Sequence, residues 1–307
     1  MSKTREFITE CFGRPPQASS QLDGDKHGFT REEYDRLREP GRPMFKLVRG
    51  GMKTLGRLSR GIQLGWKTGF DSGRTLDYVY ENQPRGVTPL GRVMDRGYLA
   101  SIGWRGIRVR KSNLQTLLRD AVERTHAEGR PVRLLDIASG PGRYVLETVR
   151  DLKHIPITAT LRDYKPENVE AARRLAKAHG LKNVVAVQGD AFDRAALATT
   201  NPKPTVAIVS GLYELFPANE PVLNSLRGLA DALAPGGYLV YTNQPWHPQV
   251  EFIARVLTNR EGKPWVMRRR PQGEMDELVQ VAGFEKLRQE IDQWGIFSVS
   301  LARRKAS

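Results

Sequence analysis

Residues 134–144 read LLDIASGPGRY, and this stretch decides the fold class. It starts as a short apolar run, passes through a turn that contains two glycines, and continues at helical spacing. Because glycine carries no side chain, the backbone of such a turn can approach a ligand closely at the carboxyl end of a sheet. The stretch therefore predicts a buried strand, a turn and a helix, with a nucleotide-like cofactor at the turn.

Apolar runs alternate with amphipathic segments along the rest of the chain. Strands are predicted over 132–138, 157–164, 183–190, 205–211 and 238–243, and helices over 113–128, 144–152, 166–180 and 220–237. This alternation predicts a parallel sheet with helices on both faces, a doubly wound α/β domain. The runs 284–292 and 295–304 have only Gln293 and Trp294 between them, which predicts a closing antiparallel hairpin.

Three more predicted strands end in residues suited to a nucleoside. Asp163 ends the second strand, where its carboxylate can accept both ribose hydroxyls, and Gly189-Asp190-Ala191 ends the third, where an adenine could be held. Ser210-Gly211 ends the fourth. All of them fall on the side where open α/β sheets bind ligands. Taken singly, these carboxylates could also be exposed turn residues, and Asp136 could serve the N-terminus of the following helix.

Over residues 113–307 the sequence resembles the class I S-adenosylmethionine-dependent methyltransferases, by the motifs LLDIASGPGRY, GDAF and LAPGGYLVYT and by the final hairpin. The resemblance implies a Rossmann-like fold, with S-adenosylmethionine as the cofactor. It places Asp136, Ala138 and Gly140 at the methionine end of the cofactor, Asp163 at the ribose, and Asp190 with Ala191 at the adenine. The full expected cofactor set is Asp136, Ala138, Ser139, Gly140, Gly142, Asp163, Asp190, Ala191, Phe192 and Ser210.

A nicotinamide-binding Rossmann domain is the nearest competing interpretation. Its motif, G-x-G-x-x-G/A, needs a small third position so that helix and strand can pack closely. Val145 occupies that position here, and the terminal hairpin also argues against it. A narrower resemblance, carried by GWKTGFDSGRTLDYVY, GYLASIGWRGIRVRK, SGLYELFP and NQPWHPQ, is to a bacterial group of methyltransferases, some of them joined to α/β hydrolases.

The acceptor side is expected to come from segments just past the fourth and fifth strands. These segments contain Tyr213 and Glu214, and Trp246 and His247 between two prolines. We expect His247 or Glu214 to handle a proton, since an amine acceptor must lose one, and Tyr213 and Trp246 to shape the pocket. The plainer alternatives are core packing for Trp246 and helix capping for His247. No metal site is predicted.

Segments that precede the α/β domain are also expected to fold over the pocket. These segments are 77–80 and 98–108, with Arg105 or Arg108 near the cofactor carboxylate or an anionic substrate. Surface arginines that bind neither group are the plainer alternative.

Residues 44–67 form a basic amphipathic segment that contains no acidic residue. As one helix, it would place its apolar residues within an arc of roughly 160°, with most of its cations opposite. Its five glycines each cost about 0.5 to 1 kcal/mol in a helix interior, so the apolar face needs a partner. That partner is the protein's own core, an anionic membrane surface or an RNA backbone.

Composition bounds the remaining possibilities. The chain has 307 residues, 39% of them hydrophobic, and a formal net charge of +15. Residues 1–112 hold 22 Lys and Arg against 12 Asp and Glu, so the positive charge is concentrated there. The single cysteine, Cys11, and the absence of a signal-like or membrane-spanning apolar run predict a cytoplasmic protein. We expect a loosely held lead-in over 1–41, a basic helical cap region over 42–112 and the methyltransferase domain over 113–307.

These observations predict an S-adenosylmethionine-dependent methyltransferase. A lipid head group or another amphiphile, reached from an anionic membrane surface through residues 44–67, is the preferred acceptor. A soluble small-molecule methyltransferase that uses the same segment as a lid is the first alternative, and an RNA-binding or RNA-modifying protein is the second. No RNA-binding module is recognisable, so nucleic acid is the least favoured partner. The oligomeric state, the acceptor atom and the number of methyl groups stay open.

Overall fold

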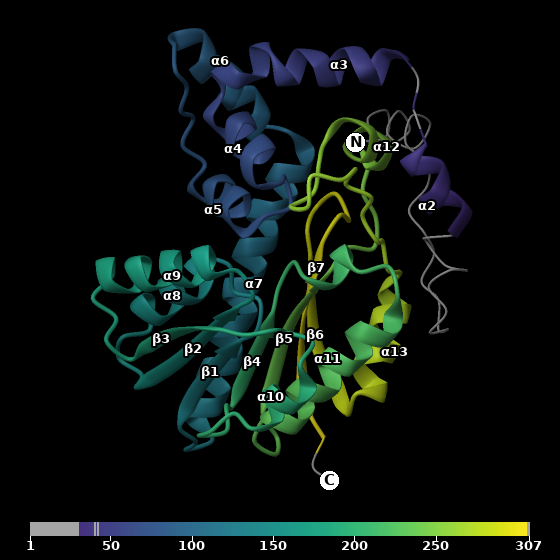
Figure 1. The fold of residues 1–307 in the computed structure, drawn as a ribbon. Helices are drawn as coiled ribbons and strands as arrows, with labels where there is room; N and C mark the ends of the chain where they lie inside the picture. The colour runs from purple at the N-terminus through teal and green to yellow at the C-terminus, as the bar shows by residue number, and fades with distance from the viewer. Residues whose placement is uncertain (1–30, 40, 42, 306–307) are drawn as a thin grey trace.

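A seven-stranded mixed sheet forms the centre of the protein (Figure 1). The computed structural model describes residues 31–39, 41 and 43–305. The strand order is β3-β2-β1-β4-β5-β7-β6. Five strands run parallel: β1 (Val132–Asp136), β2 (Ile157–Asp163), β3 (Val184–Gln188), β4 (Val206–Val209) and β5 (Tyr238–Asn243). β7 (Ser298–Arg304) pairs antiparallel with both β5 and β6 (Phe284–Ile291). The predicted doubly wound sheet with a C-terminal hairpin is confirmed.

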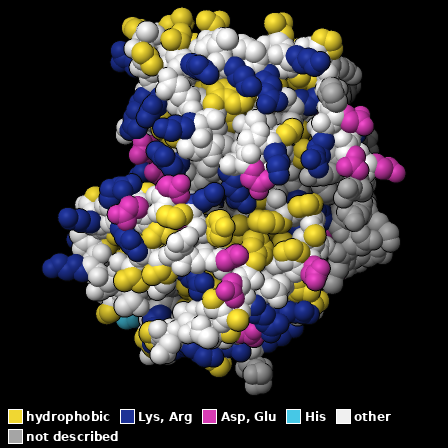
Figure 2. Space-filling view, viewed as in Figure 1, with side chains coloured by type: hydrophobic (Ala, Val, Ile, Leu, Met, Phe, Trp, Pro, Cys, Tyr) yellow, Lys and Arg dark blue, Asp and Glu magenta, His cyan; other side chains and the backbone are white. Residues whose placement is uncertain are grey.

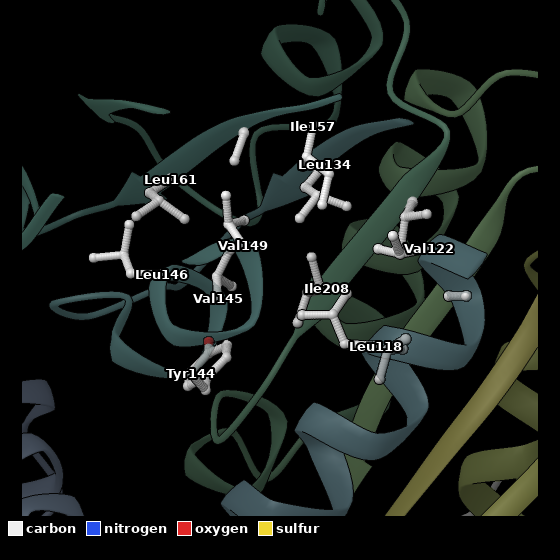
Figure 3. Packing of buried hydrophobic residues seen from close by; sticks show 14 of the residues in the cluster. Leu118, Val122, Leu134, Tyr144, Val145, Leu146, Val149, Ile157, Leu161 and Ile208 are labelled. Atoms are coloured by element: carbon white, nitrogen blue, oxygen red, sulfur yellow. The ribbon is translucent and has the colours of Figure 1, made fainter. Parts of the chain in front are cut away.

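Helices cover both faces of the sheet, as a buried parallel sheet requires. α7 (Ile102–Ala127), α8 (Arg143–Asp151) and α9 (Pro166–Ala178) lie on one face. α10 (Arg194–Ala198), α11 (Asn219–Ala232) and α13 (Gln272–Val281) lie on the other. The helices α7, α8 and α9 and the sheet face that they cover form the first hydrophobic core, which Figure 3 shows. In it, side chains of α7 and α8 point toward the strands: Leu118, Val122 and Val145 toward Leu134 and Ile208. Every residue of β4 and β5 is buried, which explains the apolar sequence of β4 and of β5 up to Thr242.

α7 is longer than the sequence predicted, and Ser112 lies inside it instead of capping it. The helix starts after Ser101 and ends before Gly129, whose φ of 68° is typical of a glycine helix terminator. Its N-terminal half bears Trp104, Gly106 and Ile107, which are buried against aromatic residues from outside the sheet. The expected boundary at residue 112 therefore falls within one continuous helix.

The segment 43–99, called the cap below, folds into short helices above the carboxyl ends of the strands (Figure 1). It comprises α3 (Pro43–Lys53), the 3₁₀ turn η1 (Leu55–Leu58), α4 (Arg60–Thr68), α5 (Gly73–Glu81) and α6 (Pro89–Leu99). The single helix expected over 44–67 is thus wrong. Ser59 is extended and caps α4 by accepting from the Ile62 N–H, so the chain breaks there as a new helix begins.

Asp95 joins three cap helices from a fully buried position on α6. Its Oδ1 accepts from the Ser59 hydroxyl at 2.5 Å and from the Gly61 N–H at 2.8 Å. Its Oδ2 accepts from the Tyr78 hydroxyl and from the Arg85 N–H. A buried carboxylate is tolerated when it is fully hydrogen-bonded, and this one fixes α4 and α5 against α6.

A third core joins the cap to the α/β domain. It contains Phe70, Tyr78, Trp104, Trp246 and Phe297, together with residues of α12 (Val250–Val256). α2 (Arg31–Arg38) also contacts α12, so part of the lead-in expected to be loosely held is helical; residues 1–30, 40 and 42 of that expectation lie outside the described residues. In the part of the chain that the structure describes, no helix is long and apolar enough to cross a bilayer.

Candidate active site

A crevice of about 600 Å³ lies at the carboxyl ends of β1, β2 and β4. It falls within the size range of small-molecule sites. The turn after β1 forms its floor, with Gly140 at φ 55° and Gly142 at φ 71°, where side-chain-bearing residues are strained. Nine of the ten predicted cofactor residues line it: Ala138, Ser139, Gly140, Gly142, Asp163, Asp190, Ala191, Phe192 and Ser210.

The start of α5 covers this turn from above. A Cβ at Gly73 would lie 3.1 Å from the Gly140 Cα, so the two backbones approach closely only because both residues are glycines. Arg143, the first residue of α8, donates to Asp77 at 2.6 and 3.0 Å and to Glu81 at 2.9 Å. These ion pairs fasten the cap over the crevice. The expectation that residues 77–80 fold over the pocket agrees with this placement, since Asp77 and Tyr80 line it.

Most acceptor positions of the Asp163 carboxylate are used by hydrogen bonds within the protein. Its Oδ2 accepts from the Gly140 N–H at 2.8 Å, and its Oδ1 accepts from the Lys165 N–H at 2.9 Å and the Asn168 amide at 3.0 Å. A carboxylate has about four acceptor positions, so about one remains for a ligand. Asp163 therefore braces the glycine turn and has less capacity for two ribose hydroxyls than expected.

Asp136 lies beneath the turn, and it is the one predicted cofactor residue that is absent from the crevice wall. It is fully buried, and its carboxylate accepts from the Tyr144 hydroxyl at 2.7 Å and from the Ala138 N–H at 3.3 Å. Burial raises its pKa to about 7, against the opposing effect of the Tyr144 hydrogen bond. Its position supports the shape of the turn and gives it no direct route to the cofactor.

The far end of the crevice is walled by two aromatic rings. Phe192 and Phe216 meet at 4.5 Å between ring centroids, in an edge-to-face arrangement. Asp190 is exposed beside them, and its carboxylate accepts from the Phe192 N–H at 2.9 Å. Phe216 was not predicted from sequence. It reaches the crevice from the segment after β4, where the sequence analysis selected Tyr213 and Glu214 instead.

The crevice fits an adenosyl cofactor by several independent features. The glycine turn admits close backbone contact, and the rings of Phe192 and Phe216 offer an apolar slot for a base. Ser210 adds a buried hydroxyl that has no hydrogen-bond partner among the described residues. An orphaned polar group of this kind is costly unless a ligand satisfies it. Ala138, Gly140, Asp163, Ala191, Phe192 and Ser210 are the residues that would hold the group.

A second cavity of about 400 Å³, called the apolar cavity below, opens from the crevice. The two spaces share five lining residues: Asp71, Leu76, Arg110, Gly211 and Leu215. The remaining wall is mainly apolar and aromatic, from the cap, α7, α12 and the segment before α13: Met52, Ile62, Met94, Tyr98, Trp104, Ile107, Phe252, Ile253, Leu257, Trp265, Met267 and Phe297. A molecule in this cavity would meet one in the crevice at the shared residues.

Arg110 and Glu214 form a buried ion pair at this junction. The Arg110 Nη1 lies 2.9 Å from the Glu214 Oε1, and the guanidinium stacks over the Phe297 ring at 4.9 Å. A Cβ at Gly211 would lie 3.0 Å from the Arg110 Nη2, so this glycine leaves room for the guanidinium. Because Glu214 is paired, its carboxylate is poorly placed to act as a base. Arg110 lines both spaces, whereas Arg105 and Arg108, the arginines expected near the pocket, line neither.

His247 lines the apolar cavity and is fixed as a neutral imidazole. Its Nδ1 accepts from the Gln249 N–H at 3.0 Å, which leaves the ring proton on Nε2. Burial, with a smaller effect of Arg269, lowers its pKa to about 3. The side chain can donate a hydrogen bond into the cavity from Nε2 and is a weak base. This differs from the proton-handling role predicted for it.

Tyr213 and Trp246 are core residues, on neither wall of the two spaces. The Tyr213 hydroxyl lies 3.0 Å from the hydroxyl of Ser225, a residue of α11. Trp246 packs in the third core. The pocket-shaping role predicted for these two residues is therefore corrected, since neither lines a pocket. For Trp246 the plainer alternative, core packing, describes its position. Strand β4 is followed by the turn η2 (Tyr213–Leu215), which directs Tyr213 inward and Glu214 to the junction.

Asp71 is the functional candidate that sequence reasoning missed. It lies in the turn between α4 and α5, is 8% exposed, and lines both spaces. The turn packs against the segment 258–260, where the Phe70 N–H donates to the Thr258 carbonyl at 2.9 Å. That contact joins parts of the chain almost 190 residues apart. The sequence includes Asp71 in the stretch GWKTGFDSGRTLDYVY but could not place its side chain at both spaces.

Comparisons with known proteins agree with this geometry. The fold is shared with solved methyltransferases. One of them, magnesium protoporphyrin IX methyltransferase (ChlM) from Synechocystis PCC 6803, was solved with bound SAH. It matches at 14% identity, with a TM-score of 0.51, over 85% of this chain and 99% of that chain. A possible exported protein from Bordetella parapertussis matches at 22% identity, with a TM-score of 0.62, over 76% of this chain and 80% of that chain. At these identities the likeness concerns the fold.

Residues 4–304 match the protein family described as "Putative methyltransferase", and the chain belongs to that family. It is also 48% identical over 311 residues to "Uncharacterized protein YnbC" of Escherichia coli (strain K12). The match covers 99% of this chain and 53% of YnbC, so the chain spans about half the length of that relative. S-adenosylmethionine is the cofactor of the class that this fold and crevice define.

Proposed function

We propose that the protein transfers a methyl group from S-adenosylmethionine in the crevice to an acceptor in the apolar cavity. The observation that carries the proposal is the junction of the two spaces, where they share Asp71, Leu76, Arg110, Gly211 and Leu215. Methyl transfer is an in-line displacement, for which the acceptor atom must lie about 3 to 3.5 Å from the methyl carbon in a dry site. The cap, which lines both spaces, would exclude bulk water from them.

The acceptor is an amphiphile or a lipid with a small polar group. The apolar wall around Trp104, Trp265 and Met267 favours a hydrophobic body, since removing apolar surface from water stabilises binding. The polar groups of the cavity, the Arg110–Glu214 pair and His247, lie where a head group could be oriented. A polar group at the junction would then face the cofactor while the hydrophobic body fills the cavity.

The cap also offers a surface for docking on an anionic membrane. Hydrophobic side chains of α3, η1, α6 and the loop before α6 are exposed on it, and they are called the apolar rim: Met44, Leu47, Val48, Leu55, Val87, Leu90 and Val93. Figure 2 shows hydrophobic side chains along the top of the molecule, with Lys and Arg close by. No acidic residue occurs between residues 44 and 70, so the rim complements an anionic surface.

α3 divides its apolar residues between the core and this rim. Phe45 and Met52 pack against the third core, and Arg49 and Lys53 lie over the Trp66 ring at 5.8 and 5.3 Å. Leu47 is 79% exposed and Met44 is 58% exposed. Two of the three partners considered for residues 44–67, the protein's own core and a membrane surface, thus keep support, because core packing accounts for one part of the segment and leaves another part exposed.

Flotation with phosphatidylglycerol vesicles tests the membrane part of the proposal. The double variant Leu47→Glu/Leu90→Glu adds two carboxylates to exposed positions of the rim, so it should fold normally and lose most vesicle binding. Val281→Glu is the matched control, because Val281 is 48% exposed on α13, outside the cap, and it should float like the wild type. Equal flotation of the rim variant and the wild type would contradict membrane docking.

The soluble small-molecule alternative is supported by a different observation. The Arg143 ion pairs and the buried Asp95 hold the cap firmly on the domain, as a fixed lid requires. On this alternative, the wild type does not float with vesicles, and methyl label from S-adenosylmethionine appears only in water-soluble products.

A further inference from the structure

We propose that Asp71 is the general base of the reaction and that the acceptor group is an uncharged hydroxyl on a hydrophobic body. The inference rests on the proposed methyl transfer, since it concerns the acceptor in the apolar cavity. It starts from position: Asp71 belongs to the small set of residues that line both spaces, so its side chain lies where acceptor and cofactor meet.

Asp71 is a buried carboxylate with an unsatisfied oxygen. The residue is 8% exposed, and its Oδ1 has no hydrogen-bond partner among the described residues. Leaving a buried acceptor unpaired costs free energy, and folded proteins keep such groups chiefly where they have a function. A hydroxyl donor in the apolar cavity would satisfy this oxygen.

The neighbours of Asp71 leave it able to accept a proton near neutral pH. Burial raises its pKa from 3.8 to about 6, and Glu261 adds to the rise. The Arg260 guanidinium and the Arg260 N–H, from the segment packed on the turn, act in the opposite direction. The other charged groups at the junction, Arg110 and Glu214, neutralise each other. A base with a pKa close to the working pH is the most effective one.

The other candidate bases of the cavity are excluded by their bonding partners or by a raised pKa. Glu214 is held by Arg110, and His247 carries its proton on the nitrogen that is free to face the cavity. Tyr98 lines the cavity too, but burial raises its pKa well above 10, so it stays neutral. Asp71 is therefore the residue among the described cavity walls that can take a proton.

The same charges indicate the acceptor. Among the described residues of the cavity wall, His247 is neutral and Arg110 is paired with Glu214, so the remaining charged group is Asp71. Its charge, which Arg260 partly offsets, is removed when the carboxylate takes a proton. A charged acceptor would lose its hydration to a mainly apolar wall, whereas an alcohol or phenol has little to lose. An uncharged hydroxyl on a hydrophobic body therefore suits the cavity best.

The step balances without a further reagent. The acceptor oxygen forms a bond to the methyl carbon while the carbon–sulfur bond breaks, and the sulfur keeps that electron pair. The hydroxyl proton passes to the Asp71 carboxylate and from there to water when the site opens. The products are a methyl ether, S-adenosylhomocysteine and the released proton.

The test measures transfer of labelled methyl from S-adenosylmethionine to a total lipid and metabolite extract of Escherichia coli, the organism of the relative that is 48% identical. For the wild type we expect label in methyl ethers, at a rate that falls about tenfold per pH unit below pH 6 and is level above it. Asp71→Asn should lower the rate at pH 8 by about 100-fold or more and abolish the pH dependence. Asp71→Glu should restore part of the rate and the pH dependence.

Two controls separate this inference from the proposed function. S-adenosylhomocysteine should bind to Asp71→Asn as it does to the wild type, and Asp231→Asn, which alters an exposed pair on α11, should keep the wild-type rate and profile. Label in methylamines, or an unchanged pH profile in Asp71→Asn, would overturn the assignment of Asp71 and leave methyl transfer standing. No transfer by the wild type to any extract would overturn the proposed function itself.

Discussion

Gly140 and Gly142 are single residues on which the crevice depends. Both have positive φ, at 55° and 71°, and a Cβ at Gly142 would lie 2.5 Å from a methyl group of Leu161. Asp163 then fixes the turn by accepting from the Gly140 N–H. The glycines and the carboxylate are all visible in the sequence, which is why nine of the ten residues predicted to bind the cofactor lie in one crevice; their contact with the cofactor stays a prediction.

Gly140→Ala should weaken cofactor binding beyond its effect on stability. The left-handed backbone costs about 1 to 2 kcal/mol for alanine, and the new methyl group would lie 3.4 Å from the Gly73 Cα, in the crevice. Gly129→Ala is the matched control, since Gly129 has φ 68° with no atom within 4 Å of the added Cβ. Urea denaturation should show similar stability losses, and calorimetry should show tenfold or weaker S-adenosylhomocysteine binding only for Gly140→Ala. Equal binding by both variants would remove Gly140 from the site.

Asp136 gives the stability of the protein a specific pH dependence. Its folded pKa of about 7 exceeds the unfolded value of 3.8, so its stabilising contribution is complete below pH 3.8 and is lost as the pH rises through 7. Asparagine cannot ionise at this position. Asp136→Asn should therefore gain stability relative to the wild type between pH 5 and pH 8, by about 3 kcal/mol. Urea denaturation at the two pH values measures this difference, and a difference that does not change with pH would contradict the assignment.

At the scale of elements, α5 and α8 form the clasp that holds the cap over the cofactor. Arg143 pairs with Asp77 and Glu81, and the side chains involved are 16 to 26% exposed, so solvent screens these pairs less than it screens surface pairs. The sequence predicted that residues 77–80 would cover the pocket, but it could not supply the partner, because the contact spans more than 60 residues.

Arg143→Gln should release S-adenosylhomocysteine faster, by about five- to tenfold, with a stability loss of about 1 kcal/mol. Removing the cation leaves Asp77 and Glu81 repelling each other at the crevice mouth, and the cap should open more often. Arg119→Gln is the control, because Arg119 pairs with Asp151 at 2.8 Å where both side chains are 38% exposed. Stopped-flow release rates would decide, and identical rates for the two variants would show that the clasp does not gate the crevice.

Helix boundaries and long-range contacts limited what the sequence could reveal. Ser112 has the chemistry of an N-cap, yet α7 runs through it because Trp104 and Ile107 gain burial against the third core. The segment 44–67 has helical periodicity, yet it breaks at Ser59, whose side chain satisfies the start of α4 and also bonds Asp95. In both cases tertiary packing outweighed the local signal.

At the scale of the whole molecule, a sheet domain and a basic cap enclose two joined spaces of different character. The sheet domain supplies the polar, glycine-floored crevice, and the cap supplies much of the apolar cavity. The alternating strands and helices predicted the first space, because its residues lie at strand ends. The second space is assembled from the cap, α7, α12 and the segment before α13. Its key residue, Asp71, lies on a turn that is positioned by contacts with the distant segment 258–260. The acceptor side was therefore predicted less well than the cofactor side.

The central claim is that the crevice over Gly140 binds the adenosyl cofactor. Titration calorimetry of the full chain with S-adenosylhomocysteine tests it most directly. The account predicts saturable heat for one site per chain, with micromolar affinity that drops at least tenfold in Gly140→Ala and is unchanged in Gly129→Ala. An absence of heat with the folded wild-type protein would contradict the claim.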